Sequence, residues 1–162
     1  WTHPHAFGLN IRPVLPYLNV IIGTEEEFFA LLAADPTPVL QARPLSRAEI
    51  NHLDNLVRTQ LAIPAGPDTL VLKRGPRGVT VFTRTGAPVD IPGFPVEVLN
   101  TVGAGDAFAS GFIYGFLKGW DWYQCGRMGN ACGALVVTRH GCARALPYEQ
   151  EALDFIEARG GF

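Results

Sequence analysis

The sequence predicts an α/β fold built on a largely parallel β-sheet. Stretches rich in β-branched residues alternate along the chain with stretches of helical spacing, which is the order expected when helices cover a sheet. Several β-rich stretches are almost continuously hydrophobic, as strands buried on both faces are. The chain has 162 residues, of which 48% are hydrophobic, so it can bury a core, and one globular domain over 1–162 is expected.

The first predicted strand runs directly into a helix. LNVIIG (18–23) is a short β-branched stretch that ends in glycine. TEEEFFALLA follows, with Thr24 as a residue that caps helices and with acids in the first turn. Prolines then predict a loop over 35–45.

The middle of the chain predicts a helix followed by two strands. Ser46 and Glu49 have capping-box spacing, and the apolar residues after them recur at helical intervals up to Leu61. Two β-rich stretches, 69–75 and 79–86, are joined by the turn-forming sequence GPRG.

The last part of the chain predicts one more strand and three helices. The strand is expected at 96–99, and Gly119 is expected to end the first of the helices. The helices are predicted over 104–117, 122–137 and 148–158.

Charge and composition exclude several classes of partner. The net charge of -2 comes from 13 basic and 15 acidic residues spread along the chain, so no basic stripe indicates nucleic acid. No apolar stretch is long enough to cross a membrane. The cysteines Cys125, Cys132 and Cys142 contain no CxxC pair, which argues against disulfides and zinc and favours a reducing compartment. We therefore expect a cytoplasmic protein that binds small molecules.

The most informative stretch is NTVGAGDAFA (100–109), where G-A-G-D opens a predicted helix. The first N–H groups of a helix have no partner within the helix, and glycine lets that backbone approach a ligand closely. The expected ligand is therefore an anion. Asp106 then has two interpretations that spacing alone does not separate. It is either a carboxylate that caps the helix or a general base beside an anion site. Neither GxxxxGK[ST] nor GxGxxG is present, so a nucleotide site here is built differently from those two types.

The stretch NTVGAGDAFASGF (100–112) resembles the C-terminal signature D-T-x-G-A-G-D-x-F of the PfkB, or ribokinase-like, family of carbohydrate kinases. Three other stretches similar to that family occur in the family's order: VIIGTEEEF, LVLKRGPRGVTVF and GNACGALVVTRHGC. The resemblance covers almost the whole chain. It implies a three-layer ribokinase-like fold with a mostly parallel central sheet, and an enzyme that transfers the γ-phosphate of ATP to a sugar hydroxyl.

The resemblance assigns roles to individual residues. Asp106 would be the catalytic base, the N–H groups of Ala104, Gly105 and Asp106 would form the anion hole, and Thr101 and Gly103 would shape that turn. Lys73, Gly75 and Gly78 would lie along ATP, and Asn130 would border the adenine pocket. Glu27 would contact Mg²⁺ through water, and 139–143 would hold a monovalent cation such as K⁺.

Two residues depart from the family pattern. Thr24 replaces the Asn of a magnesium-linked N-x-x-E motif in which Glu27 is kept, and Asn100 replaces the first Asp of the signature, which removes one charge. Together with GWDW (119–122), these departures are similar to one branch of the family, the 5-dehydro-2-deoxygluconokinases of inositol catabolism. A fructokinase, a ribokinase, a 2-keto-3-deoxygluconate kinase and a non-catalytic nucleotide-binding module remain alternatives.

The resemblance also bears on how complete the site is. Full-length family members place their sugar-binding residues and β-lid in an N-terminal half that has no counterpart in this sequence. We therefore expect the chain alone to bind sugar poorly and to be inactive. An exposed sheet edge is expected as well, with a homodimer as its consequence.

Overall fold

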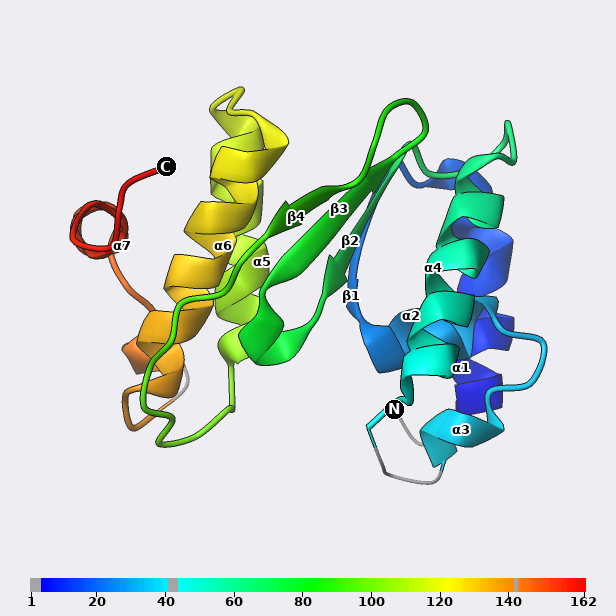
Figure 1. Ribbon diagram of the computed structural model, residues 1–162, viewed down its shortest axis with the longest axis horizontal. Coiled ribbons are helices and arrows are strands. Elements are labelled where there is room, and N and C mark those ends of the chain that lie inside the picture. Colours follow the sequence, from blue (N-terminus) through cyan, green and yellow to red (C-terminus); the bar gives the residue numbers. More distant parts are fainter. Residues whose placement is uncertain (1–3, 41–43, 142) are drawn as a thin grey trace. The chain divides into compact units, whose positions relative to one another are not determined.

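The computed structural model describes residues 4–40, 44–141 and 143–162, which form two compact units (Figure 1). The first unit consists of the chain up to Arg74 together with Thr80–Pro88. The second consists of Gly75–Val79 together with Val89–Phe162. The expectation of one domain over 1–162 stays a prediction.

The order of the elements is that of an α/β protein. In the first half of the chain they are α1 (Pro4–Ile11), the 3-10 helix η1 (Arg12–Tyr17), β1 (Val20–Thr24), α2 (Glu25–Leu32), α3 (Thr37–Leu40), α4 (Arg47–Leu61) and β2 (Thr69–Lys73). They continue with the 3-10 helix η2 (Gly75–Arg77), β3 (Val79–Thr83), β4 (Val89–Ile91), α5 (Ala104–Leu117), α6 (Trp122–Val137), the 3-10 helix η3 (Ala143–Ala145) and α7 (Glu149–Glu157).

The strands form one sheet in the order β1-β2-β3-β4. β1 and β2 are parallel, with Val20 opposite Thr69 and Thr24 opposite Lys73. The connections from β2 to β3 and from β3 to β4 are too short for the crossover that a parallel pair requires, so these pairs are antiparallel. The predicted α/β class is confirmed, and the described sheet is mixed.

Local capping signals explain why the predicted helices begin where they do. The side chain of Thr24 accepts a hydrogen bond from the N–H of Glu27, and Ser46 accepts one from Glu49, so each forms a capping box. Asp121 does the same for α6 with Gln124. Each capping box satisfies N–H groups that the first turn of its helix leaves free.

The predicted strand at 96–99 is wrong, because this segment is irregular. The N–H of Leu99 donates to the carbonyl of Val137 at 2.8 Å, at the end of α6, and is therefore not part of a sheet. Val98 and Leu99 are also more than half exposed, at 52% and 55%. The backbone of this segment thus bonds to the end of α6 rather than to a strand.

Two short helices lie where the sequence predicted none. The predicted loop over 35–45 contains α3, where Asp35 accepts hydrogen bonds from both the N–H and the hydroxyl of Thr37. The first helix, α1, begins at Pro4, and proline is compatible with the first turn of a helix. Residues 41–43 of the predicted loop lie outside the described residues.

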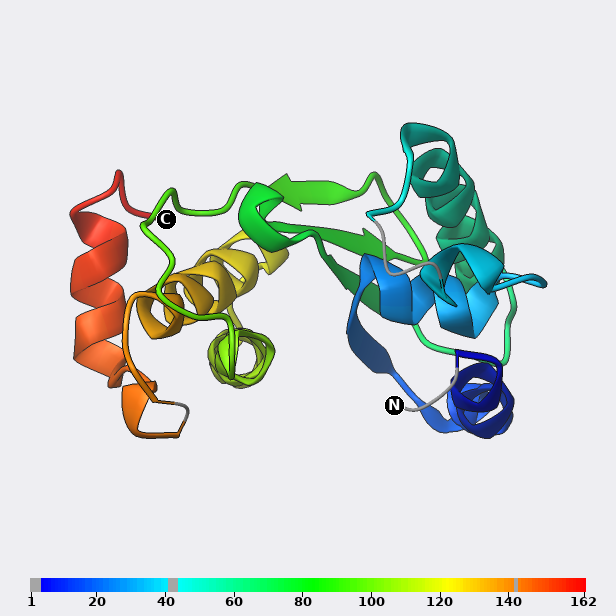
Figure 2. The same cartoon turned by 90° about the horizontal axis from the view of Figure 1, so that it is seen from below.

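Each unit has its own hydrophobic core. In the first unit, α2 and α4 cover β2, and the core includes Phe28, Phe29, Leu53, Val57, Leu70, Leu72 and Phe82. In the second unit, α6 packs against α5 and α7 (Figure 2), and the core includes Phe94, Ala107, Met128, Ala131, Val136, Ala152 and Ile156. The second core fixes the position of α5, whose first turn contains Asp106, the predicted catalytic base.

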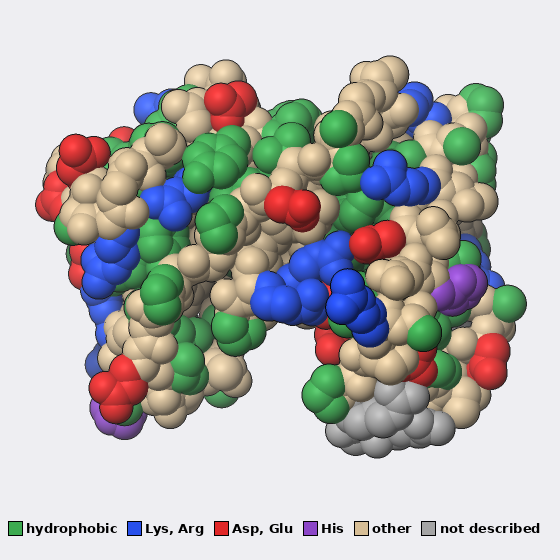
Figure 3. Space-filling model, in the orientation of Figure 1, with side chains coloured by type: hydrophobic (Ala, Val, Ile, Leu, Met, Phe, Trp, Pro, Cys, Tyr) green, Lys and Arg blue, Asp and Glu red, His purple; other side chains and the backbone are tan. Residues whose placement is uncertain are grey.

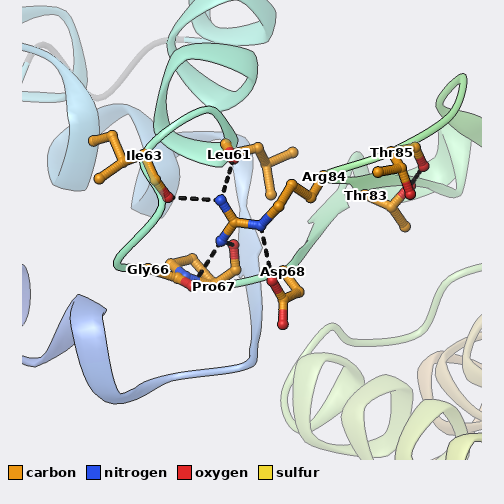
Figure 4. Close-up of polar contacts among 8 residues, drawn as sticks. All are labelled: Leu61, Ile63, Gly66, Pro67, Asp68, Thr83, Arg84 and Thr85. Carbon is orange, nitrogen blue, oxygen red and sulfur yellow. Dashed lines mark hydrogen bonds and ion pairs between the residues drawn. The ribbon is translucent and has the colours of Figure 1, made fainter.

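One arginine organises the connection between α4 and β2 (Figure 4). Arg84 donates to the carbonyls of Leu61, Ile63, Gly66 and Pro67 at 2.8, 2.7, 3.0 and 3.2 Å, and its Nε lies 2.8 Å from Oδ1 of Asp68. A planar guanidinium has five N–H groups, and here they satisfy backbone groups of an irregular segment.

Candidate active site

The corner before α5 has the geometry of an anion site. Gly103 is the N-cap residue, and its φ of +84° lies in the left-handed region that favours glycine. Gly103 has no side chain, and no side-chain hydrogen bond caps this helix. The first N–H groups of a helix have no intrahelical acceptor, so this end of α5 can receive an anion.

The N–H groups of this turn differ in their availability. The N–H of Ala104 donates to the carbonyl of Thr101 at 3.3 Å, which closes the turn, and the N–H of Ala107 makes a helical bond to Gly103 at 2.9 Å. The N–H groups of Gly105 and Asp106 lie between these two. The N–H groups of Gly105 and Asp106 can thus meet an anion, whereas that of Ala104, which was predicted to belong to the same anion hole, already has an acceptor in the turn. The anion hole itself stays a prediction.

Asp106 is exposed in the first turn of α5. Within the described part of the chain, the hydrogen bond that this residue makes outside the helical ladder is accepted by its carbonyl, from the hydroxyl of Ser110 at 2.9 Å. Its carboxylate is therefore free to meet a substrate, and the corner is open rather than sealed in the core. No side-chain hydrogen bond caps α5, so the structure does not show Asp106 as a helix cap, and its role as a general base stays a prediction.

Asn100 fixes the start of the corner. Its side-chain Oδ1 accepts a hydrogen bond from the N–H of Val102 at 2.9 Å, and its Nδ2 donates to the carbonyl of Arg139 at 2.6 Å. The guanidinium of Arg139 is in turn paired with Glu151 of α7. The sequence analysis treated Asn100 only as the loss of a charge. Its hydrogen bond to Arg139 spans 39 residues, so no local sequence pattern could reveal it.

Two glycines in the connection between β2 and β3, which was predicted to lie along ATP, have different surroundings. At Gly75, φ is +58° and an added Cβ would meet nothing within 4 Å, so a ligand can approach there. At Gly78, φ is +95° and an added Cβ would lie 2.1 Å from the carbonyl oxygen of Ile91. Gly78 is thus required by the packing of the backbone, whatever lies along this segment.

Basic side chains gather beside these glycines. Figure 3 shows a group of Lys and Arg side chains over the connection between β2 and β3, which follows Lys73. Lys73 itself is the last residue of β2 and is half-buried. Positive side chains favour anionic ligands, but Arg74, the first residue after β2, is already paired with Glu25 and Asp54.

Arg74 ties three elements of the first unit together, and the sequence analysis did not identify it. Its Nη1 lies 2.7 Å from Oε1 of Glu25, its Nη2 lies 2.8 Å from Oδ1 of Asp54, and its Nε donates to the hydroxyl of Thr80 at 2.8 Å. The first residue of α2 is therefore fixed to α4 and β3. The acids lie 49 and 20 residues from Arg74 in sequence, so no local pattern could reveal them.

Glu27 has a structural partner as well as its predicted role at a metal. Its Oε2 accepts the N–H of Thr24 at 2.7 Å in the capping box of α2. Since Thr24 lies opposite Lys73 in the parallel pair, the start of α2 and the end of β2 lie side by side. A carboxylate offers about four lone-pair sites, so capping leaves Glu27 able to accept from metal-bound water.

Asn130 is buried, at 9% exposure, and its Nδ2 donates to the carbonyls of Ile91 and Pro92 at 3.2 and 3.1 Å. The side chain thus secures the chain just after β4 against α6. Its predicted place beside an adenine pocket stays a prediction. Of the monovalent-cation segment 139–143, Cys142 lies outside the described residues.

The two described cysteines are free and buried. Burial is the main cause that raises the pKa of the Cys125 and Cys132 thiols to about 11 in each case. Both thiols therefore stay protonated at neutral pH and pack in the core, as predicted.

The predicted site residues divide between the two units. The first unit brings Thr24, Glu27 and Lys73 together at the carboxyl ends of β1 and β2. The second unit contains the corner from Asn100 to Asp106 and the glycines and asparagine discussed above. Among the described residues, no three His, Cys, Asp or Glu side chains form a cluster that could hold a metal ion alone.

Comparison with known proteins gives a consistent result. The family model described as pfkB family carbohydrate kinase matches residues 3–149. A 5-dehydro-2-deoxygluconokinase of Clostridium perfringens is 40% identical over 160 residues, which is 97% of this chain and 42% of that protein. The chain thus spans about two fifths of the length of the curated relatives that it matches.

Solved structures show the same fold. The nucleoside kinase of Burkholderia thailandensis in complex with inosine has a TM-score of 0.70 and 26% identity, over 96% of this chain and 45% of that one. A ribokinase II candidate from E. coli, in complex with ATP and Mg²⁺, has a TM-score of 0.68 and 23% identity, over 95% of this chain and 46% of that one. The ribokinase-like fold is therefore confirmed. Within the described residues, no helix has the length and apolar character needed to span a membrane.

Proposed function

Because the chain belongs to the pfkB family of carbohydrate kinases, we propose that it carries the nucleotide site and the general base of an ATP-dependent sugar kinase. One observation supports this most directly. An exposed carboxylate, Asp106, stands in the first turn of α5 beside two N–H groups that can bind an anion, and no side chain caps that turn. A base and an anion hole at one corner are the two parts that phosphoryl transfer to an alcohol needs.

In the proposed reaction, Asp106 accepts the proton of a sugar hydroxyl as its oxygen attacks the γ-phosphorus of ATP. The bond between that phosphorus and the β,γ-bridging oxygen breaks, ADP leaves, and the proton is later released to solvent. The N–H groups of Gly105 and Asp106 hold the transferring phosphoryl group, which carries its negative charge on its outer oxygens. By the family resemblance, Lys73 and Gly75 would lie along the remaining phosphates, where Lys73 would supply positive charge and the open surroundings of Gly75 would supply space.

Magnesium is part of the proposal through Glu27. Mg²⁺, when bound, would neutralise phosphate charge, and it usually keeps several of its waters. Glu27 would hold one of those waters while its other lone pairs keep the capping box. Arg74 supports this arrangement by fixing Glu25 at the start of the same helix.

Substitutions of Glu27 separate the two roles. Gln keeps the capping box but lacks the charge, so Glu27→Gln is expected to raise the Mg²⁺ concentration for half-maximal activity by about tenfold with little change in stability. Glu27→Ala is expected to lose about 1 kcal/mol of stability in addition. Magnesium titrations of activity and urea unfolding measure the two effects. A Gln variant with the magnesium dependence of the wild type would restrict Glu27 to capping.

The proposed substrate is 5-dehydro-2-deoxygluconate, with the hydroxyl of a sugar acid as phosphoryl acceptor. The proposal rests on the similarity to the Clostridium perfringens protein of that name. The protein encoded by the complete gene would be offered this sugar acid, 2-keto-3-deoxygluconate, fructose and ribose, with ADP release as the readout. We expect kcat/KM for the first to exceed the others by at least about 10²-fold.

Other outcomes of this assay have definite meanings. A preference for fructose, ribose or 2-keto-3-deoxygluconate would keep the kinase and replace its substrate. Binding of ATP without transfer to any of the four would support the non-catalytic alternative. The homodimer and the cytoplasmic location stay predictions.

A further inference from the structure

The corner before α5 is tied to the end of α6 by the side chain of one residue, Asn100. We propose that the Asn100 amide takes the place of the monovalent cation predicted here, so that the corner keeps its shape without K⁺. The proposal rests on the proposed function only for its kinetic readout, because it also predicts how stability responds to K⁺.

The two partners of the amide fix its orientation. The N–H of Val102 can only donate, so the atom 2.9 Å from it is the acceptor Oδ1. The carbonyl of Arg139 can only accept, so the atom 2.6 Å from it is the donor Nδ2. Each half of the amide thus meets the one kind of group that it can bind, and aspartate could not replace the donor.

The same contact argues against a cation between these two groups. Monovalent cations such as K⁺ are held by oxygen atoms, among them backbone carbonyls. The carbonyl of Arg139 receives an N–H at this point, and an N–H that points toward a cation repels it. A carboxylate at position 100 would instead bring two acceptors face to face, and a cation between them would relieve their repulsion.

The segment that receives this hydrogen bond is itself held in place. The guanidinium of Arg139 is paired with Glu151 and donates to the carbonyl of Ala145 at 3.3 Å. The N–H of Leu99 also donates to the carbonyl of Val137, next to this segment. Asn100 therefore links the corner to a fixed support, and a change in this link is expected to reach the N–H groups of Gly105 and Asp106.

The test compares the wild type with Asn100→Asp and with Asn100→Ala as the matched control. Each protein, made from the complete gene, is measured in KCl and in tetramethylammonium chloride at equal ionic strength. We expect the wild-type rate to differ by less than about twofold between the salts, because the amide needs no cation. Asn100→Asp is expected to lose about tenfold in tetramethylammonium and to recover most of it in K⁺, whereas Asn100→Ala stays low in both.

Thermal unfolding in the same two salts gives a second readout that needs no turnover. Asn100→Asp is expected to unfold at a higher temperature in K⁺, while the wild type and Asn100→Ala show no K⁺-specific shift. The proposal is overturned if K⁺ activates or stabilises the wild type strongly, or if Asn100→Asp responds to K⁺ no more than Asn100→Ala does. If the wild type transfers no phosphate at all, the proposed function fails, and the unfolding data still decide the role of Asn100. If the variants do not fold, the comparison of the wild type in the two salts still decides whether the corner needs K⁺.

Discussion

Asp106→Asn is expected to lower kcat by about 10²–10⁴-fold while ATP affinity stays within about threefold of the wild type. The amide has nearly the shape of the carboxylate but cannot take the proton of the sugar hydroxyl. Asp106 is exposed and its backbone is held by α5, so the substitution changes the chemistry without changing the core. Steady-state ADP release measures kcat, and calorimetry with a non-hydrolysable ATP analogue measures affinity.

Asp121→Asn is the matched control for this experiment. Asp121 caps α6 through its side chain, and Asn caps helices as well as Asp does. The same chemical change at that helix terminus is therefore expected to leave kcat within about twofold. If Asp106→Asn and Asp121→Asn had equal activity, Asp106 would not be the base.

Gly78→Ala is expected to destabilise the protein by roughly 3–5 kcal/mol, a large part of the total stability of an ordinary domain. The methyl group would lie 2.1 Å from the carbonyl oxygen of Ile91 and 2.4 Å from the backbone nitrogen of Gly93. Neither group can rotate away, because both belong to the backbone. The conformation at φ +95° adds strain for any residue with a Cβ. The midpoint of urea unfolding measures the loss.

Gly75→Ala separates packing from ligand contact. Its φ is +58° and the space around it is open, so we expect a cost of only about 1 kcal/mol. If ATP lies along this segment, the added methyl group should nevertheless raise the KM for ATP. A Gly75→Ala variant as unstable as Gly78→Ala would contradict this assignment of the two glycines.

Most of the fold could be predicted because its signals are local. The capping residues Thr24 and Ser46 and the glycine at 119 lie within a few residues of the helix ends that they mark. The segment 96–99 misled the prediction because alternating apolar residues look alike in a strand and on the end of a helix. Only its partner, the carbonyl of Val137, tells the two apart, and that partner is far away in sequence.

The same difference divides the candidate site. The corner around Asp106 is contiguous, so both its anion geometry and its acid can be read from ten residues. Arg74 and Asn100 each have a partner nearby in sequence, but their other partners lie 20 to 49 residues away. Their types alone did not indicate those partners, because an arginine after a strand and an asparagine in a turn are common.

Apart from its ion pair with Asp68, Arg84 binds the connection between α4 and β2 through peptide oxygens rather than side chains. Apart from Asp68, the side chains of that connection are therefore loosely constrained. Related sequences can vary there as long as the four carbonyl oxygens still face Arg84. The converse holds for the arginine, because a lysine has one ammonium group and cannot reach four oxygens spread over seven residues. We expect natural variation to concentrate at the residues that supply these acceptor carbonyls and to leave Arg84 unchanged.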